Sequence, residues 1–207
     1  MFGSGKATLN VFAPVFALLR PPSVKPTTLF VQGACVALMW VGLFLLNSWL
    51  FKQFAFSEQV SWIFLPAALR MLAVLMLGWV GVAGIFLGSA ITGVFVMGKI
   101  EGSQILIGSA LSALSPTLAL LLCAYAFGMR ANLVGLSASK LLILSVVAAS
   151  FTAVLHNIHF ALSGQVDAVG DSLLAMFIGD LVGTLVVLYL AKLILMALPL
   201  SGASKSA

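Results

Sequence analysis

The stretch that decides the fold is SLLAMFIGDLVGTLVVLYLAKLILMAL, which occupies residues 172–198. A helix needs about 20 mostly apolar residues to cross the roughly 30 Å of hydrocarbon in a bilayer. This stretch is long enough, and Asp180 and Lys192 are its only charged residues. It therefore predicts a transmembrane helix, and it raises the question of why a carboxylate lies within that helix.

The composition of the whole chain points the same way. Of its 207 residues, 62% are hydrophobic and only 7% are charged, and the mean hydropathy is +1.22. Soluble domains carry about 25% charged residues, so these values exclude an ordinary soluble fold and predict an all-α polytopic membrane protein. The net charge of +5 comes from scattered basic residues rather than a basic patch. We therefore expect the lipid bilayer as a partner, and no nucleic acid.

Further apolar stretches of similar length precede this one. Together they predict about six transmembrane helices, at residues 29–51, 61–78, 81–98, 103–127, 138–161 and 172–198. Accordingly, residues 1–28 are expected to form a cytoplasmic tail, residues 29–198 the helical bundle and residues 199–207 a second cytoplasmic tail. Little more than Gly78 and Gly81 separates the second and third stretches, which predicts two spans joined by a glycine turn. A re-entrant hairpin is the alternative.

The charged residues predict the orientation of the bundle. If the N-terminus is cytoplasmic, that side of the membrane receives Lys6, Arg20, Lys25, Arg130, Lys140 and Lys205. The outer side then receives only two basic residues and most of the acidic ones: Lys52, Lys99, Glu58, Glu101, Asp167 and Asp171. Cytoplasmic loops carry an excess of Lys and Arg, so both termini are predicted to be cytoplasmic.

Two formal charges fall near the middle of predicted helices. Arg70 lies in the outer half of the second helix, and Asp180 lies in the outer half of the sixth. At 1.5 Å per residue, both are roughly 12–14 Å below the outer interface. Each charge would cost about 2.5–3.5 kcal/mol at the centre of a helix, and their equal depth and opposite sign predict an ion pair. The pair either fastens the two helices together or also binds a ligand; separate partners for the two charges, or a protonated Asp180, are the alternatives.

One face of the fifth predicted helix is small and polar. At alternating spacings of four and three residues it carries Ser145, Ala149, Thr152, His156 and His159. Such a face packs against other helices rather than against lipid. The two histidines are expected either to be hydrogen-bonded near the outer interface, or to line a ligand cavity with Thr152 or sense pH. No acidic ligand shares this face, so neither a metal site nor a cofactor is expected.

Small residues mark close helix contacts elsewhere in the chain. Gly84 and Gly88 lie four residues apart in the third predicted helix, and Gly179 and Gly183 do so in the sixth. Such spacing lets helix backbones approach each other, so these glycines are expected to serve helix packing. No phosphate-binding loop, nucleophile elbow, zinc-protease motif or close pair of carboxylates is present in the sequence, so the chain is not expected to be an enzyme.

Two segments resemble a known family. The first is WIFLPAALRMLAVLMLGW at residues 62–79, followed by GIFLGS at residues 84–89; the second is FIGDLVGT at residues 177–184. They resemble the first hairpin and the closing helix, with its G-D-x-x-G, of the MASE family, first class. These are membrane-associated sensor domains of bacterial signalling proteins. The likeness extends over roughly residues 61–198.

The resemblance implies a multi-pass protein of the bacterial inner membrane that perceives a small signal. Such domains usually precede a histidine kinase or a diguanylate cyclase. Because no output domain is evident in this chain, we expect a stand-alone module that acts through a partner protein. The polar groups within the membrane gather in the outer half of the spans, which favours an outward-facing pocket for sensing or capture. A substrate-binding subunit of a small-molecule transporter and a purely structural membrane protein are the alternatives.

Overall fold

The computed structural model describes residue 19 and residues 24–57, 60–97, 101–127, 137–165 and 168–197. Within these ranges the fold consists of helices and contains no strand. The helices are α2 (Pro26–Leu50), α3 (Pro66–Leu77), α4 (Trp79–Thr92), α5 (Gly102–Phe127), α6 (Ala138–Leu162) and α7 (Val169–Ala197). A short 3₁₀ turn, Lys52–Phe54, follows α2, and a π-helical turn, Gly93–Met97, extends α4.

The helices in the described ranges have the length and composition of membrane spans. Five of them are long and apolar enough to cross a membrane, including α4 together with its π-helical turn. Their outer surfaces carry large exposed apolar side chains such as Phe30, Leu38 and Phe95, as expected of surfaces that face lipid. The prediction of an all-α, multi-pass membrane protein is confirmed.

The helix α3 is shorter than the span predicted at residues 61–78, and that prediction is wrong over its first part. The helix begins at Pro66 and has 12 residues, which correspond to about 18 Å. Proline has no amide donor and therefore suits the first turn of a helix, where amides lack a partner within the helix. Hydropathy could not reveal this start, because residues 61–65 are nearly as apolar as the helix that follows.

The non-helical segment at residues 61–65 is held by hydrogen bonds to other parts of the chain. The amide of Phe64 donates to the carbonyl of Gly179 in α7 (3.0 Å). The amide of Leu65 donates to Oδ1 of Asn47, a buried side chain near the end of α2 (2.8 Å). These bonds satisfy amides that would otherwise be orphaned at the buried start of α3.

The helices α3 and α4 are joined by the predicted glycine turn, at Gly78. This residue has φ +56°, a left-handed conformation that favours glycine, and a Cβ there would overlap the backbone of Leu19. Gly81 lies equally close to the backbone carbonyl of Ala73 in α3. Both approaches need glycine, and that of Gly81 brings the two helices together at one end of the bundle.

Two further glycines pack α4 against α2. A Cβ at Gly84 would lie 2.7 Å from Cβ of Val36, and a Cβ at Gly88 would lie 2.7 Å from Cβ of Trp40. Separations this short do not occur between real side chains, so larger residues would push the helices apart. Gly84 and Gly88 therefore lie at a helix contact of the kind that their spacing predicts.

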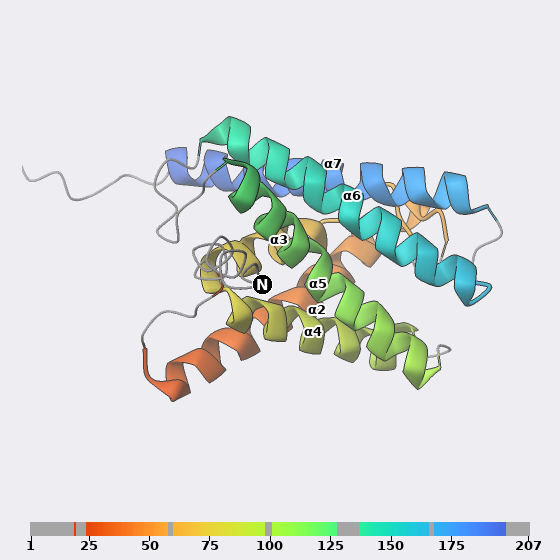
Figure 1. Cartoon of the computed structure of the whole chain (residues 1–207), viewed down its shortest axis with the longest axis horizontal. Coiled ribbons are helices and arrows are strands. Elements are labelled where there is room, and N and C mark those ends of the chain that lie inside the picture. Colours follow the sequence, from red (N-terminus) through yellow and green to blue (C-terminus); the bar gives the residue numbers. More distant parts are fainter. Residues whose placement is uncertain are drawn as a thin grey trace, which may run out of the picture.

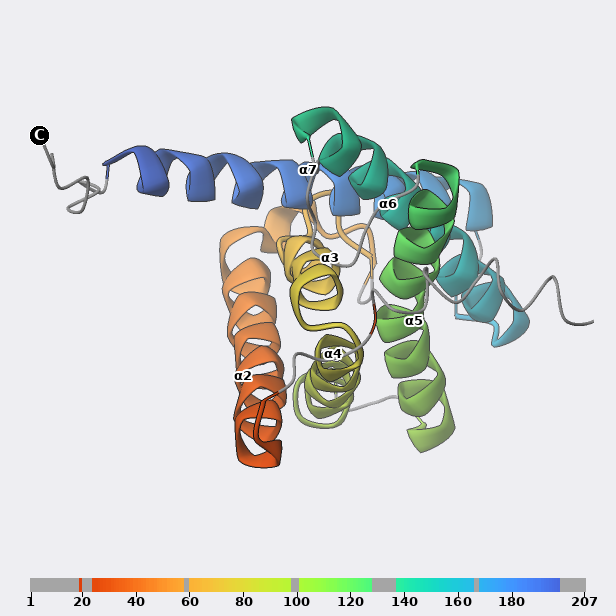
Figure 2. The same ribbon diagram turned by 60° about the vertical axis from the view of Figure 1, so that its left-hand side comes forward.

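The helices run alternately between two ends of the bundle (Figure 1). One end, at the right of this view, is where α2, α4 and α6 finish and where α3, α5 and α7 begin. We call it the distal end, and the opposite one the proximal end; the predicted orientation would place the distal end outside the cell. Figure 2 shows α2, α4 and α5 side by side, with α7 crossing them at a steep angle.

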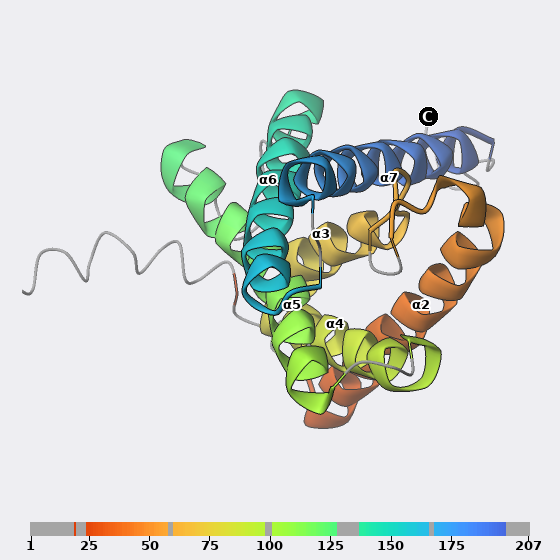
Figure 3. The ribbon, with the colours of Figure 1, turned by 90° about the vertical axis from the view of Figure 1, so that its right-hand side faces the viewer.

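The short helix α3 lies at the centre of the bundle. It contacts each of the other five helices, and the view toward the distal end shows them around it (Figure 3). On the proximal side its apolar side chains join a continuous buried cluster that includes Val74, Leu75, Leu120 and Leu144. Apolar side chains therefore pack around α3 on the proximal side of the bundle.

The predicted orientation depends mainly on residues outside the described ranges. Outside them lie Lys6, Arg20, Glu58, Lys99, Arg130, Asp167 and Lys205. Most of the predicted tail at residues 1–28 and all of the tail at residues 199–207 also lie outside them. The cytoplasmic position of both termini therefore stays a prediction.

Candidate ligand-binding cavity

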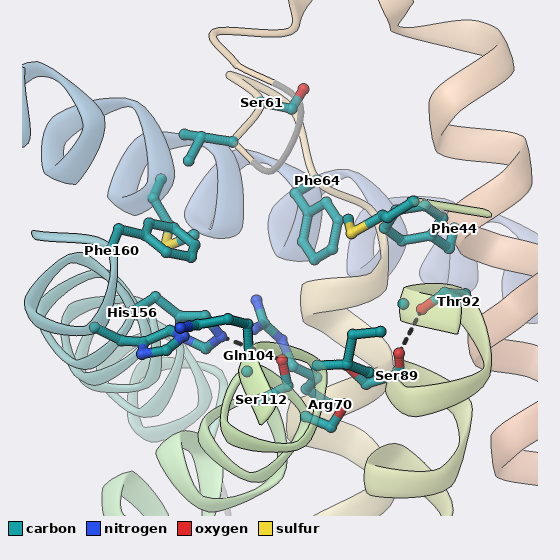
Figure 4. A pocket seen from close by; sticks show the side chains of 18 of the residues that line it. Phe44, Ser61, Phe64, Arg70, Ser89, Thr92, Gln104, Ser112, His156 and Phe160 are labelled. Atoms are coloured by element: carbon teal, nitrogen blue, oxygen red, sulfur yellow. Dashed lines mark hydrogen bonds between the residues drawn. The ribbon is translucent and has the colours of Figure 1, made fainter. Parts of the chain in front are cut away.

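A cavity lies in the distal half of the bundle, beside the first turns of α3 (Figure 4). It contains about 810 Å³ of space, its mouth included. Each helix from α2 to α7 contributes to the wall. The lining side chains are Trp40, Phe44, Val60, Ser61, Phe64, Arg70, Ser89, Thr92, Met97, Gln104, Ile105, Ser109, Ser112, His156, His159, Phe160, Gln165, Met176 and Asp180.

The ion pair expected between Arg70 and Asp180 is present, at the floor of this cavity. Nη2 of Arg70 donates to Oδ2 of Asp180 at 2.6 Å, and each side chain is only 4% exposed. The Cζ atom of Arg70 also lies 5.8 Å from the ring centroid of Trp40 and 5.3 Å from that of Phe64. Aromatic faces attract a cation, most strongly where water is excluded. The guanidinium is therefore held by one carboxylate and two aromatic rings.

Arg70 keeps most of its hydrogen-bonding capacity in this arrangement. A guanidinium has five N–H donors, and among the described residues only Nη2 has an acceptor. The other nitrogens are not sealed off by neighbouring atoms, because the side chain borders the cavity. Figure 4 shows the guanidinium next to the cavity, between Phe64 and His156. A buried donor without a partner costs about 1–3 kcal/mol, so these N–H groups require water or a ligand.

His156 lies beside the ion pair and has a hydrogen-bonding partner at each ring nitrogen. Its Nδ1 lies 3.1 Å from the carbonyl oxygen of Thr152, one turn earlier in α6, and its Nε2 lies 3.3 Å from Oγ of Ser112 in α5. A carbonyl can only accept, so Nδ1 donates to Thr152 whenever it carries a hydrogen, and the Ser112 hydroxyl can donate to or accept from Nε2. His156 is therefore fixed in orientation and joins α6 to α5.

His159 lines the cavity from the same face of α6, one turn nearer the distal end. Its ring lies 6.0 Å from that of Phe160, which also borders the cavity. Among the residues that the structure describes, no three His, Cys, Asp or Glu side chains come together as a metal site would require. The two histidines thus lie where a ligand cavity was one of the expected alternatives.

A smaller polar hollow of about 230 Å³ lies on the other side of the ion pair. Its wall includes Ser145, Thr152 and Thr184, and the Thr152 side chain lies beside the Asp180 carboxylate. Arg70 and Asp180 border both spaces, so the pair forms the partition between them. Thr152, expected to line a cavity together with the histidines, borders this hollow rather than the larger space.

Gly179 and Gly183 determine how closely Asp180 approaches the start of α3. A Cβ on Gly179 would overlap the carbonyl oxygen of Ser61, and a Cβ on Gly183 would overlap that of Phe64. The predicted packing of these glycines is thus against the non-helical segment before α3 rather than against another helix. Their close approach fixes the carboxylate between them at the cavity floor.

Sequence reasoning did not identify the aromatic wall or the polar rim of the cavity. Trp40, Phe44 and Phe64 belong to apolar stretches, in which a cavity-facing ring has the same signature as a lipid-facing one. Nε2 of Gln165 donates to Oε1 of Gln104 at 3.2 Å, which joins the α6–α7 connection to α5 at the distal rim. Both glutamines adjoin apolar stretches at the same predicted side of the membrane. This shared depth is the one sequence signal that could have predicted their contact.

No protein-family model, curated protein or solved structure matches the chain. The resemblance of roughly residues 61–198 to MASE sensor domains therefore stays a prediction. What the chain does must be inferred from the cavity and the chemistry of its walls.

Proposed function

We propose that this chain is a membrane-embedded binding module of the sensor type. It takes up a small molecule in the distal cavity and acts through a partner protein. The observation that carries the proposal is the guanidinium of Arg70, which is buried, is bound by a single carboxylate oxygen and borders a cavity of about 810 Å³. Ionisable groups within membranes usually mark a ligand or ion site.

A purely structural role accounts less well for this arrangement. A buried ion pair that only fastens two helices is stable when its remaining donors and acceptors also find partners within the protein. Arg70 instead has N–H groups without an acceptor among the described residues, next to unfilled space. These groups are suited to a molecule that enters and leaves.

The apolar packing on the proximal side of α3 favours sensing or capture over passage. The apolar cluster around Val74, Leu120 and Leu144 lies below the ion pair, so a ligand that enters from the distal end stops at Arg70. A ligand there competes with Asp180 for the guanidinium, and so alters how firmly α3 is tied to α7. That change gives a partner protein something to detect.

A transport role is the second candidate, and one observation favours it. The polar hollow lined by Ser145, Thr152 and Thr184 continues from the ion pair toward the proximal end. A substrate-binding subunit that works with an energising partner would need such a continuation. Separation of the Arg70–Asp180 pair would then connect the two spaces.

Two glycine-to-leucine variants test whether the cavity binds anything. Gly108 borders the cavity, whereas Gly42 lies on the exposed side of α2, and at both positions an added Cβ has no neighbour within 4 Å. Gly108→Leu should therefore fill part of the cavity without a clash, and Gly42→Leu is its matched control. Both changes favour the helix by a similar amount, about 1 kcal/mol.

The measurement is thermal unfolding in lipid nanodiscs against a panel of carboxylic acids, amines, nucleobases and sugars. A ligand at 100 times its Kd stabilises the folded state by about 2.7 kcal/mol, which raises Tm by about 5–10 °C for a chain of this size. The unmodified chain and Gly42→Leu should respond to the same compounds, and Gly108→Leu should not. Silence of the unmodified chain across the panel, or an equal response of Gly108→Leu, would contradict the proposal.

A further inference from the structure

We infer that the ligand of this cavity is a small aromatic carboxylate, with its carboxylate on Arg70 and its ring among the aromatic side chains of the wall. The inference rests on the proposed function and adds the chemical class of the ligand. It follows from two features of the cavity: which hydrogen-bonding groups the floor has left over, and what the wall above the floor is made of.

The guanidinium at the floor of the cavity has hydrogens left to donate. The two ring nitrogens of His156 are occupied by Oγ of Ser112 and the carbonyl oxygen of Thr152. Oδ2 of Asp180 accepts from Nη2 of Arg70, and the Thr152 side chain lies beside the same carboxylate. The Nε and Nη1 hydrogens of Arg70 have no acceptor among the described residues, so they favour a head group that accepts hydrogen bonds.

Among acceptors, a carboxylate suits this guanidinium best. Its two oxygens match two parallel N–H donors, and the opposite charges shorten and strengthen both hydrogen bonds. A neutral amide presents a single acceptor to the same donors. An ammonium group presents none to these donors.

Asp180 makes this site weaker for anions than an isolated arginine would be. Its carboxylate is buried and bound to the same guanidinium, so a second carboxylate on Arg70 is repelled by it. Asp180→Asn removes the repelling charge, so it should strengthen the binding of a carboxylate and leave the binding of a neutral amide little changed.

The walls above the floor favour a flat ring over a flexible chain. The ring of Phe64 stands edge-on to those of Trp40 and Phe44, with centroids 6.2 Å and 6.3 Å away. Phe160 borders the opposite side, and the cavity-lining methionines can adapt their shape to a ring. A ligand ring can continue these edge-to-face contacts, which an aliphatic chain cannot do.

Isothermal titration of the full chain in nanodiscs with four probes tests the inference. Indole-3-acetate, indole-3-acetamide and tryptamine share one ring and differ in head-group charge, and decanoate is an aliphatic carboxylate. Indole-3-acetate should bind about tenfold or more tightly than the acetamide, because charge-assisted hydrogen bonds are roughly twice as strong as neutral ones. It should also bind more tightly than decanoate, and tryptamine should bind least.

Variants connect this preference to the residues. The double change Arg70→Gln with Asp180→Asn should abolish the preference for indole-3-acetate over the acetamide. Asp180→Asn alone should strengthen indole-3-acetate binding, and Thr184→Val, beyond the ion pair, should leave the preference unchanged. If the ion-pair variants do not fold, the four probes on the unmodified chain still decide the question.

The outcomes separate this inference from the proposed function. Binding of the acetamide or tryptamine as tightly as indole-3-acetate overturns the carboxylate, and equal binding of decanoate overturns the aromatic ring; a ligand-binding cavity remains in both cases. Failure of all four probes overturns the inference, and the broad thermal screen then shows whether the cavity binds another class. Silence in that screen as well overturns the proposed function.

Discussion

The ion pair between Arg70 and Asp180 can be tested by a double-mutant cycle. Asp180→Asn keeps the shape of the side chain and leaves the guanidinium with its aromatic neighbours and the cavity, so a loss of about 2–3 kcal/mol is expected. Arg70→Gln leaves a buried carboxylate without its counter-charge and also removes the contacts with Trp40 and Phe64. Its expected loss is therefore larger, about 3–5 kcal/mol.

The double variant joins two neutral amides where the charges were. Because neither side chain then carries an uncompensated charge, its loss should be smaller than the sum of the single losses by about 2–3 kcal/mol. The 2.6 Å hydrogen bond and the 4% exposure of both side chains place this coupling near the upper end of what contacting residues show.

The free energies come from unfolding in mixed micelles with increasing SDS, followed by the fluorescence of the tryptophans at fixed pH and lipid composition. All four forms of the cycle are measured under identical conditions. If the loss of the double variant equals the sum of the single losses within about 0.5 kcal/mol, the two side chains do not stabilise each other. The proposed floor of the cavity would then have no basis.

Two further predictions concern the segment before α3 and use the same unfolding assay. Gly183→Ala should lower the free energy of unfolding by about 1–3 kcal/mol, because its Cβ overlaps the backbone carbonyl of Phe64. The control Gly170→Ala, whose Cβ has no neighbour within 4 Å, should raise it by about 0.5–1 kcal/mol. Equal effects of the two variants would refute the close approach at Gly183. Asn47→Leu should cost about 1–3 kcal/mol, because the buried amide of Leu65 loses its acceptor, and an unchanged free energy of unfolding would show that this bond does not hold the segment.

The helices could be predicted from the sequence because lipid permits few alternatives. A backbone in hydrocarbon must satisfy its own hydrogen bonds, so a long apolar stretch is a helix almost regardless of its neighbours. The same restriction applies to charge. Arg70 and Asp180 each need a partner in a medium that offers few, and equal depth was enough to connect them across 110 positions of sequence.

The aromatic walls and the true start of α3 could not be predicted, because each depends on packing. Trp40 bonds to Thr92 and faces the cavity, while Trp49, on the same helix, is 78% exposed; hydropathy assigns both the same value. Residues 61–65 are not helical, and Phe64 and Leu65 donate their amide hydrogens to Gly179 and Asn47 instead. The two acceptors, Asn47 and Gly179, lie more than 13 positions from that segment in the sequence, so no local sequence pattern predicts these hydrogen bonds.

The mistaken helix start and the form of the cavity are connected through residues 61–65. Had residues 61–65 been helical, they would have extended α3 toward the distal end through the centre of the bundle. The cavity borders this segment at Ser61 and Phe64. Because α3 begins only at Pro66, Arg70 in its first turns lies at the floor of this cavity.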